Sequence, residues 1–228
     1  MSADERPWLA GGLVQSLEPM LKMLVSEPAS LSSVTNPDEA RRVHLADSLS
    51  GLAVEEVSAA ERCADIGSGA GFPGIPLAMA LPETDFTLID SVGKKVRFIE
   101  AVIGELALTN ARAVNARSED WAKTEGTEAY DLVTARAVAP LEALAELASP
   151  LLSDGGSLVA WKGEREGEEE KKLAALTDRL AMRLDRVVPV RPYESSRERH
   201  LYVVKKVGPT PAGLPRRAGM VRKRPLSA

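Results

Sequence analysis

The chain contains few of the residues that build disulfides and metal sites. Its 228 residues include one cysteine, Cys63, and two histidines. A single cysteine forms no internal disulfide, and its apolar surroundings predict a small core residue rather than a nucleophile. Two histidines and one cysteine so widely spaced do not suggest a structural metal site. We therefore expect a protein of the reducing cytoplasm that binds no metal.

Long apolar runs and aromatic residues are also scarce. No run of about 18 apolar residues occurs, the length that a membrane-spanning helix needs, and no signal peptide is recognisable. We therefore expect no membrane partner. Aromatic residues make up 4% of the chain, but hydrophobic residues as a whole make up 44%. This composition supplies an ample core, and the length suits one domain with an extension.

Acidic residues are missing from the C-terminal end. Residues 205–228 hold seven lysines and arginines and no acid, so this segment carries +7. Because the whole chain carries −4, residues 1–204 carry −11. A basic tail on an acidic body suits a polyanion that is bound locally. A solvated tail without a partner explains the charges equally well.

The most informative segment that is present covers residues 63–76, with the sequence CADIGSGAGFPGIP. It predicts a short strand, a glycine turn and a helix that begins near Pro73. Gly67, Gly69 and Gly71 let the backbone bend tightly and approach a ligand, because they lack a Cβ atom. The free N–H groups of the helix start would point into the same space. The segment therefore predicts a cofactor site.

Two cofactor patterns compete for this segment. Residues 69–74 match the G-x-G-x-x-G pattern of dinucleotide sites, and residues 65–71 match the D-x-G-x-G-x-G loop of S-adenosylmethionine (AdoMet) methyltransferases. Asp65 ends the predicted strand, so Gly67 opens the turn, and Phe72 then stands where a dinucleotide needs glycine. AdoMet has an ammonium group that Asp65 could attract, directly or through water. The pattern favours AdoMet, while a dinucleotide and a purely structural turn stay open.

A second acidic strand end follows at Asp90, after the predicted strand 85–90. In nucleotide-binding sheets a carboxylate at this place accepts hydrogen bonds from two ribose hydroxyls. The alternative is a turn aspartate that caps the helix beginning near Gly93. The complete order of strand, glycine loop, helix, strand and acid favours the ribose role.

Strands and helices alternate along the chain. This order predicts an α/β, class I AdoMet-dependent methyltransferase fold: a doubly wound, mainly parallel sheet of seven strands with an N-terminal helical extension. We expect strands at 62–66, 85–90, 111–115, 130–136, 157–161, 184–190 and 200–206, the last two antiparallel. We expect helices at 7–26, 36–57, 73–81, 93–107, 140–152 and 164–183.

The same order predicts three units. They are a helical extension over 1–58, a methyltransferase domain over 59–207 and a basic tail over 208–228. A dehydrogenase would continue with a sixth parallel strand and a substrate domain, which this length does not hold. The architecture therefore strengthens the choice of AdoMet.

Strand ends give further candidates, because ligands of doubly wound sheets bind there. Arg117, Ser118 and Glu119 follow the third strand, the fourth ends at Arg136, and the fifth ends at Lys162. The three cations would surround one crevice and suit a phosphate-rich substrate. The alternative for each is a surface salt bridge.

Two motifs of base methylation are missing. Residues 134–140 read TARAVAP instead of the Asn/Asp-Pro-Pro-Tyr/Phe of enzymes that methylate exocyclic amines. No cysteine lies near the fourth or fifth strand to attack a pyrimidine carbon. The acceptor is then already nucleophilic, such as a ring nitrogen, or it is not a base.

Taken together, these motifs resemble the RsmG family, also called glucose-inhibited division protein B, over about residues 30–206. The matching segments are 36–37, H-x-x-D-S-L at 44–49, the loop at 65–76, and 88–91, 94–95, 117–119, 136–137, 162–163 and 199–201. The resemblance implies a bacterial enzyme that uses AdoMet to methylate N7 of a guanine in 16S ribosomal RNA. Ser30-Leu31-Ser32 departs from the family's usual Asn-Leu-Thr.

The resemblance also implies roles for single residues. At AdoMet it places Gly67 and Phe72, and the other loop residues Asp65, Gly69 and Gly71 belong to the same expected site. It places Asp90 at the ribose and Ser118 and Glu119 at the adenine. Arg136 would lie near both cofactor and substrate. His44, Arg117, Lys162 and Arg199 would face the RNA or target base, and His44, Arg136 and Lys162 are the expected catalytic residues. The alternative for His44 is a helix histidine bonded to a neighbour.

The implied chemistry needs alignment rather than a general base. Guanine N7 has a lone pair and no proton to lose, so the enzyme must align the reacting atoms and exclude water. The target base would leave its stack, and the tail, which resembles the family's Pro-Arg-Arg-x-Gly extension, would add salt-dependent affinity. We expect a monomer that acts on 16S RNA in a small-subunit particle. The alternatives are another RNA, a protein or a small molecule as acceptor, and an RNA-binding factor without catalysis.

Overall fold

Seven strands form one sheet in the order β3-β2-β1-β4-β5-β7-β6 in a computed structural model that describes residues 12–26 and 36–226. The strands are β1 (Arg62–Ile66), β2 (Asp85–Asp90), β3 (Ala111–Asn115), β4 (Tyr130–Arg136), β5 (Leu152–Lys162), β6 (Met182–Val190) and β7 (Arg199–Lys206). The first five are parallel to one another, and β7 runs antiparallel to both β5 and β6. The predicted doubly wound sheet and its terminal antiparallel pair are confirmed.

The central strands are buried on both faces, as expected for parallel strands covered by helices. In β1 every residue from Cys63 to Ile66 is buried, and in β4 the run from Leu132 to Ala135 is buried. Burial raises the pKa of the Cys63 thiol, which confirms a core residue and leaves no accessible nucleophile.

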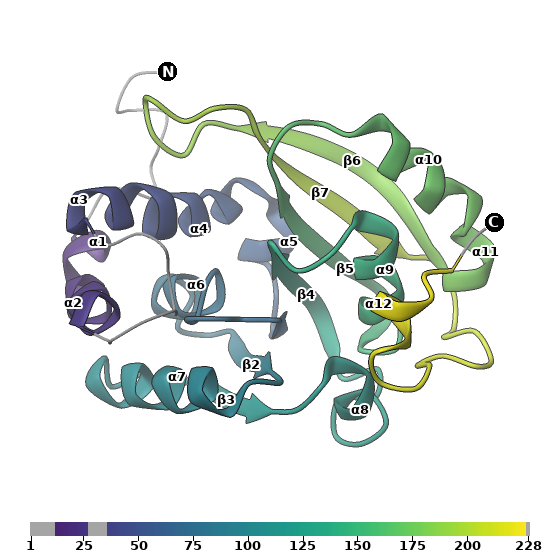
Figure 1. Ribbon diagram of the computed structural model, residues 1–228, viewed down its shortest axis with the longest axis horizontal. Coiled ribbons are helices and arrows are strands. Elements are labelled where there is room, and N and C mark those ends of the chain that lie inside the picture. The colour runs from purple at the N-terminus through teal and green to yellow at the C-terminus, as the bar shows by residue number, and fades with distance from the viewer. Residues whose placement is uncertain (1–11, 27–35, 227–228) are drawn as a thin grey trace.

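Helices cover the two faces of the sheet in separate layers (Figure 1). One layer consists of α1 (Leu13–Ser16), α2 (Glu18–Ser26), α3 (Pro37–Ala40), α4 (Asp47–Leu49), α5 (Glu55–Ser58), α6 (Gly74–Ala80) and α7 (Gly93–Glu105). The other consists of α8 (Ser118–Trp121), α9 (Leu141–Ala148), α10 (Gly167–Ala175), α11 (Thr177–Leu180) and α12 (Met220–Lys223). Each layer has its own apolar core against the sheet.

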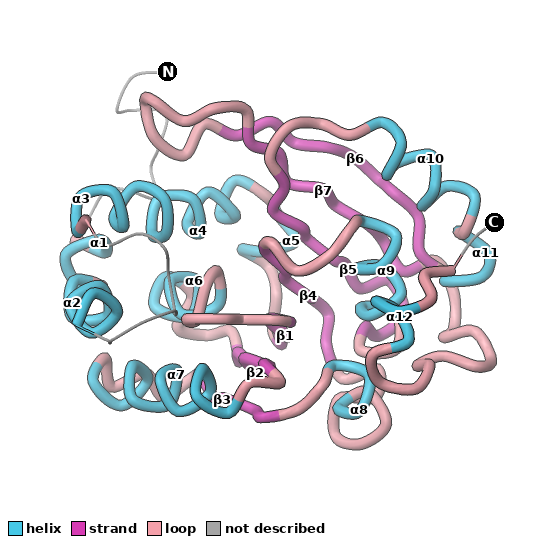
Figure 2. The backbone as a smooth tube through the Cα atoms, in the orientation of Figure 1, coloured by secondary structure: helices cyan, strands magenta, loops and turns pink. Residues whose placement is uncertain are grey.

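The N-terminal helices belong to the first of these cores. Leu17 and Leu21 of this region pack in the same cluster as Ile75 of α6 and Leu132 of β4. The helical extension therefore does not form a core of its own, and the sheet depends on it for cover. Figure 2 shows the strands as one continuous band between the helices.

The helix predicted up to residue 26 is divided at Leu17 into α1 and α2, and the helix predicted over 140–152 ends at Ala148. Three other predicted elements differ more strongly from the observed ones. The helix predicted over 36–57 changes type along its length: a π-helical segment η3 (Arg41–Ala46) follows α3, and a 3-10 segment η4 (Ser50–Ala53) follows α4. The extended backbone of Val54 then separates α5. The helix predicted over 164–183 divides at Leu176 into α10 and α11, and its last residues join β6.

The third difference concerns β5, which begins earlier than predicted. The glycine pair at 155 and 156 was expected to precede the strand, but it lies inside it. The register with β4 changes from Tyr130–Leu152 to Leu132–Ser157, so the glycines form an irregularity within the strand. Gly155 has φ +78°, which glycine tolerates. The predicted start of the first helix at residue 7, the loop after residue 26 and the Ser30-Leu31-Ser32 departure lie outside the described residues.

Candidate cofactor site and acceptor face

The glycine loop after β1 turns sharply enough to bring its backbone to the edge of β2. Gly67 and Gly69 have φ values of +65° and +64°, in the left-handed region. The N–H of Gly67 donates to the carbonyl of Ile89 at 2.8 Å. A Cβ atom at Gly67 would lie 2.7 Å from Cγ2 of Val138, which follows β4. Only glycine therefore fits where the loop meets the end of β4.

Asp65 holds the two ends of this loop together. Its carboxylate accepts hydrogen bonds from the Ser68 hydroxyl, from the Gly74 N–H at 3.1 Å and from the Thr134 hydroxyl at 2.9 Å. The residue is completely buried, and this burial raises its pKa to about 6 although the hydrogen bonds act in the opposite direction. Here Asp65 orders the loop, and its buried carboxylate does not offer the direct ammonium contact considered from the sequence.

Asp90 fixes the loop from the neighbouring strand. Its Oδ2 accepts from the N–H of Gly69 at 3.0 Å, and its Oδ1 accepts from the N–H of Val92 at 2.9 Å. The second bond forms a local turn before α7, whose N-cap is Val92, so Asp90 shapes this turn and does not cap the helix. The residue also lines the adjacent cavity, where the ribose role would place it.

A cavity of about 680 Å³ lies at the carboxyl ends of β1 to β4, where the strand order reverses. Gly67 lines it after β1, Asp90 after β2, and Arg117, Ser118 and Glu119 after β3. The segment 137–140 after β4 closes another side. The structure thus brings five of the predicted site residues to one cavity.

The cavity suits AdoMet in size and chemistry. Its volume falls within the range of small-molecule sites, about 300–1,000 Å³. Asp90 and Glu119 supply acceptors for the hydroxyl and amino groups of adenosine. Glu142 of α9 adds another, because its Oε2 is buried and has no hydrogen-bond partner among the described residues. Because Gly67 has no side chain, the loop leaves space at the cavity that a Cβ atom would occupy.

Five predicted cofactor residues do not line this cavity: Asp65, Gly69, Gly71, Phe72 and Arg136. Phe72 is only 6% exposed. A cofactor contact of these residues therefore stays a prediction. Their observed contacts are with the loop and with the neighbouring aromatic cluster.

That cluster joins the loop to the N-terminal helices. The His44 ring stacks on Phe72 with ring centroids 4.7 Å apart and an interplanar angle of 15°. The Arg136 guanidinium lies over the same phenyl ring, 5.2 Å from its centroid. Burial, assisted by the charge of Arg136, lowers the pKa of His44 to about 4. His44 is therefore a neutral, planar ring at neutral pH.

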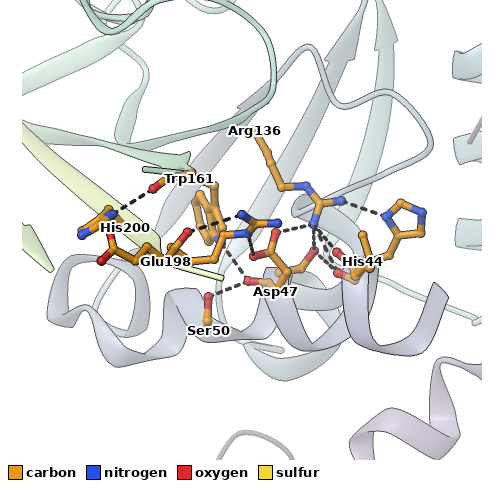
Figure 3. Close-up of polar contacts among 11 residues, drawn as sticks. His44, Asp47, Ser50, Arg136, Trp161, Glu198 and His200 are labelled. Carbon is orange, nitrogen blue, oxygen red and sulfur yellow. Dashed lines mark hydrogen bonds and ion pairs between the residues drawn. The ribbon is translucent and has the colours of Figure 1, made fainter. Parts of the chain in front are cut away.

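Arg136 is bound on its far side by the helix that carries His44 (Figure 3). Its Nη1 donates to Asp47 Oδ2 at 2.9 Å, to the His44 carbonyl at 3.3 Å and to the Ser48 hydroxyl at 3.2 Å. Nε of Arg199 lies 3.6 Å from the other Asp47 oxygen. Asp47 thus joins two arginines from different strands to the helix that carries His44. The sequence offered a signal for this, because Asp47 lies three residues after His44 on one helical face.

The three cations expected around one crevice do not meet there. Arg117 lines the cavity, but Arg136 is bound to the N-terminal helix. Lys162 forms an ion pair of 2.6 Å with Glu169, which also accepts from the N–H of Leu141. The prediction of a shared crevice is wrong, because Arg136 and Lys162 each have a nearby acidic partner.

Beside the cluster, a separate groove has a basic rim. Arg42 from the N-terminal helix and Arg197 and Arg199 from the β6–β7 side line it together with Tyr193. Arg42 and Arg197 are exposed. Arg199 therefore faces a surface on which a phosphate backbone would find several cations.

Part of the cavity wall was not anticipated from the sequence. Gly219, Val221, Arg222 and Pro225, all from the C-terminal tail, line the cavity. From the sequence, the tail was expected to add salt-dependent affinity for RNA or to be solvated without a partner, and neither expectation placed it at the cofactor cavity.

Comparison with solved structures defines the class. The fibrillarin pre-rRNA processing protein of Methanococcus jannaschii is similar with a TM-score of 0.55 and 16% identity, over 72% of this chain and 74% of that one. A predicted O-methyltransferase from Agrobacterium tumefaciens gives a TM-score of 0.53 and 20% identity, over 71% and 79% of the two chains. The fold is that of class I methyltransferases.

Sequence comparison narrows this class to a family. The GidB family model, described as rRNA small subunit methyltransferase G, matches residues 14–201. Proteins named ribosomal RNA small subunit methyltransferase G are 40% identical in Desulfitobacterium hafniense and 41% identical in Symbiobacterium thermophilum, each over 88% of this chain and 83% and 84% of theirs. The chain therefore belongs to the rRNA small subunit methyltransferase G family. Its methyl donor is AdoMet, as the glycine loop predicted.

None of the helices in the described parts of the chain has the length and apolar character that crossing a membrane requires.

Proposed function

We propose that this protein transfers the methyl group of AdoMet to N7 of one guanine in 16S ribosomal RNA of the small subunit. The observation that carries this proposal is the neutral His44–Phe72 stack beside Arg136, adjoining a cavity that suits AdoMet. A flat, uncharged surface favours a base that has left its stack. Together these features suit methyl transfer to a ring nitrogen.

The residues around the acceptor would position it rather than move a proton. Bound AdoMet supplies an activated methyl group, and guanine N7 supplies a lone pair, so no group on the protein needs to act as a base. His44 would support the base, and Arg136, already oriented by Asp47, would donate to its edge or to a phosphate. Lys162 would bind the acceptor once its ion pair with Glu169 opens. Arg117 would bind it from the cavity side.

The RNA would reach this site along the basic groove. Arg42, Arg197 and Arg199 would contact backbone phosphates, which position the substrate without reading its sequence. The acidic body repels RNA elsewhere, so binding depends on the fit at this face. We further propose a cytoplasmic monomer without a metal, which acts on RNA within a small-subunit particle. The unit boundaries at residues 58 and 207 belong to the same proposal.

The test is transfer of labelled methyl from AdoMet to naked small-subunit RNA and to small-subunit particles, both from cells that lack this gene. Digestion to nucleosides identifies the product. The expected result is label in 7-methylguanosine at one position, with the better substrate revealing the assembly state. Label in another nucleoside, or none in either substrate, would refute the proposal.

A matched pair of variants controls for the cofactor site. Asp90→Asn should lose transfer and AdoMet binding together, since Asp90 holds the loop and lines the cavity. Asp85→Asn removes the same charge at the other end of β2, where the residue is exposed. It should retain both activities.

A further inference from the structure

The C-terminal tail, residues 207–226, folds back onto the body rather than extending from it. Its first turn is anchored at Lys206, whose buried Nζ donates to Glu128 at 2.7 Å and to the Leu152 carbonyl at 2.6 Å. Thr210 continues this anchor, because its hydroxyl donates to Glu128 at 2.6 Å. Val221, farther along, is 5% exposed. The burial of these groups shows that the tail packs against the body instead of lying in solvent.

The middle of the tail is held by one buried ion pair. Nη2 of Arg216 lies 2.7 Å from Oε2 of Glu146, and the Glu146 side chain is 3% exposed. Glu146 comes from α9, the helix that also provides Glu142 to the cavity. Nη1 of Arg216 donates to the carbonyl of Arg224 at 2.8 Å. Arg216 therefore fixes the tail to α9 and at the same time closes the tail on itself.

The segment that Arg216 encloses is the part that meets the cavity. The N–H of Gly219 donates to Oε1 of Glu119 at 2.8 Å, and Gly219 has φ +79°. Val221 and Arg222 of α12 line the cavity opposite the strand ends. In Figure 1 this segment, drawn in yellow, lies beside α9 and above α8. The tail thus contacts Glu119, which the family resemblance places at the adenine end of AdoMet.

We propose that residues 207–226 form the outer wall of the AdoMet site, with Arg216 and Glu146 as the pair that holds the wall in place. Gly219 fixes the Glu119 carboxylate, and Val221 and Arg222 cover the side of the cavity that the sheet leaves open. Of the five basic residues in this segment, Arg216 is paired with an acid of the body. The tail therefore serves the cofactor site, and binding RNA is not its sole role.

The test compares Arg216→Ala with Arg217→Ala by calorimetric titration of AdoMet in the absence of RNA. Both variants remove one positive charge from the tail, but Arg217 is exposed and no ion pair joins it to the described body. Arg216→Ala should raise the Kd for AdoMet about tenfold, and Arg217→Ala should leave it unchanged. Equal effects, or no effect of Arg216→Ala, would overturn the proposal. Because RNA is absent, the outcome is independent of the identity of the methyl acceptor.

Wild-type protein offers a second test that does not depend on a variant that folds. Trypsin can cut after Arg222 and Lys223, which are exposed, and the exposed Arg197 between β6 and β7 provides an internal reference. Saturating S-adenosylhomocysteine, the demethylated product of AdoMet, should slow cleavage at the two tail sites several-fold more than at Arg197. Unchanged tail cleavage, or equal protection of both regions, would overturn the proposal.

Discussion

At the scale of the residue, the proposed acceptor site depends on two features. The His44 ring is kept neutral, and the Arg136 guanidinium is held in a fixed position. Burial of the His44 ring and the positive charge of Arg136 both oppose protonation of His44 and lower its pKa. Arg136 in turn depends on Asp47, which is 7% exposed and forms ion pairs with Arg136 and Arg199. The histidine and the arginine are thus two parts of one arrangement.

The lowered pKa of His44 predicts a pH dependence of stability. The pKa of about 4 in the folded state lies below the usual value of 6.5 for histidine, so protonation is easier after unfolding. The stability associated with neutral His44 is fully present above pH 6.5 and is lost as the pH falls from 6.5 towards 4. We expect a loss of about 1–2 kcal/mol, which is less than the full shift implies because solvent screens a partly exposed ring.

Urea unfolding between pH 4 and pH 8 measures this effect. The stability difference between wild type and His44→Gln should change over that window, because glutamine does not titrate. His200→Gln serves as the matched control, and its imidazole bonds the Gly163 carbonyl well away from Phe72. A pH-independent difference for His44→Gln would contradict the neutral ring.

Arg136 and Asp47 predict a coupled pair. Arg136→Ala should destabilise the protein by about 3 kcal/mol, because it leaves the Asp47 charge buried with only the longer contact to Arg199. Asp47→Asn in the same chain should recover part of that loss, with a coupling energy of about 1–3 kcal/mol. A double-mutant cycle of unfolding free energies measures it. Strictly additive effects would show that the pair does not join β4 to the N-terminal helix.

Single residues also show where the sequence was insufficient. The glycine spacing and Asp90 were predictable, because each motif is local and its backbone geometry follows from nearby residues. The partners of Lys162 and Arg136 were not, since Asp47 is 89 residues away from Arg136 in the chain. Whether a strand-end cation faces a ligand or an acid depends on which helix packs beside it. That packing is a property of the tertiary structure.

At the scale of the element, the loop after β1 is specified by geometry rather than by charge. Gly67→Ala would place a Cβ at φ +65° and 2.7 Å from Val138, so the loop or the β4 end must move. We expect AdoMet affinity to fall at least about tenfold. Calorimetric titration without RNA measures this change.

Gly104→Ala provides the control for that substitution. Gly104 lies in α7 with nothing within 4 Å of an added Cβ. Alanine there should leave AdoMet affinity unchanged and stabilise the protein by about 0.5–1 kcal/mol. Equal losses of affinity in the two variants would show that the loop has no special geometric requirement.

Most elements were predictable because strands and helices alternate with distinct periodicities. The failures share a cause. The π-helical segment η3 carries His44, and such segments often occur at functional sites, yet the sequence still reads as regular helix there. Likewise α12 is only four residues long, and it forms because the tail packs against α9. Packing rather than local preference determines both.

At the scale of the whole molecule, positive charge gathers at the groove outside the cofactor cavity. The cavity lining has as many cations as acids, namely Lys95, Arg117 and Arg222 against Asp90, Glu119 and Glu142. The groove has three arginines, Arg42, Arg197 and Arg199, against one acid, Glu39. A polyanion that approaches this end of the sheet is therefore attracted to the groove. This division of charge would let an acidic protein bind RNA at one local surface.

The division predicts which cations set the salt dependence of RNA binding. Arg42→Ala combined with Arg197→Ala removes two exposed charges from the groove. Each phosphate contact contributes about 0.7–0.9 to the slope of log affinity against log salt. The double variant should therefore flatten that slope by about 1.5, measured by filter binding of small-subunit RNA at several salt concentrations.

Arg62→Ala combined with Arg183→Ala is the matched control, since it removes the same charge from exposed residues near the amino ends of β1 and β6. It should leave the slope unchanged, because those strand ends lie at the opposite edge of the sheet from the groove. Equal flattening by both pairs would mean that RNA responds to net charge alone. Flattening confined to the groove pair would place the phosphates in the groove, next to the acceptor site proposed at His44.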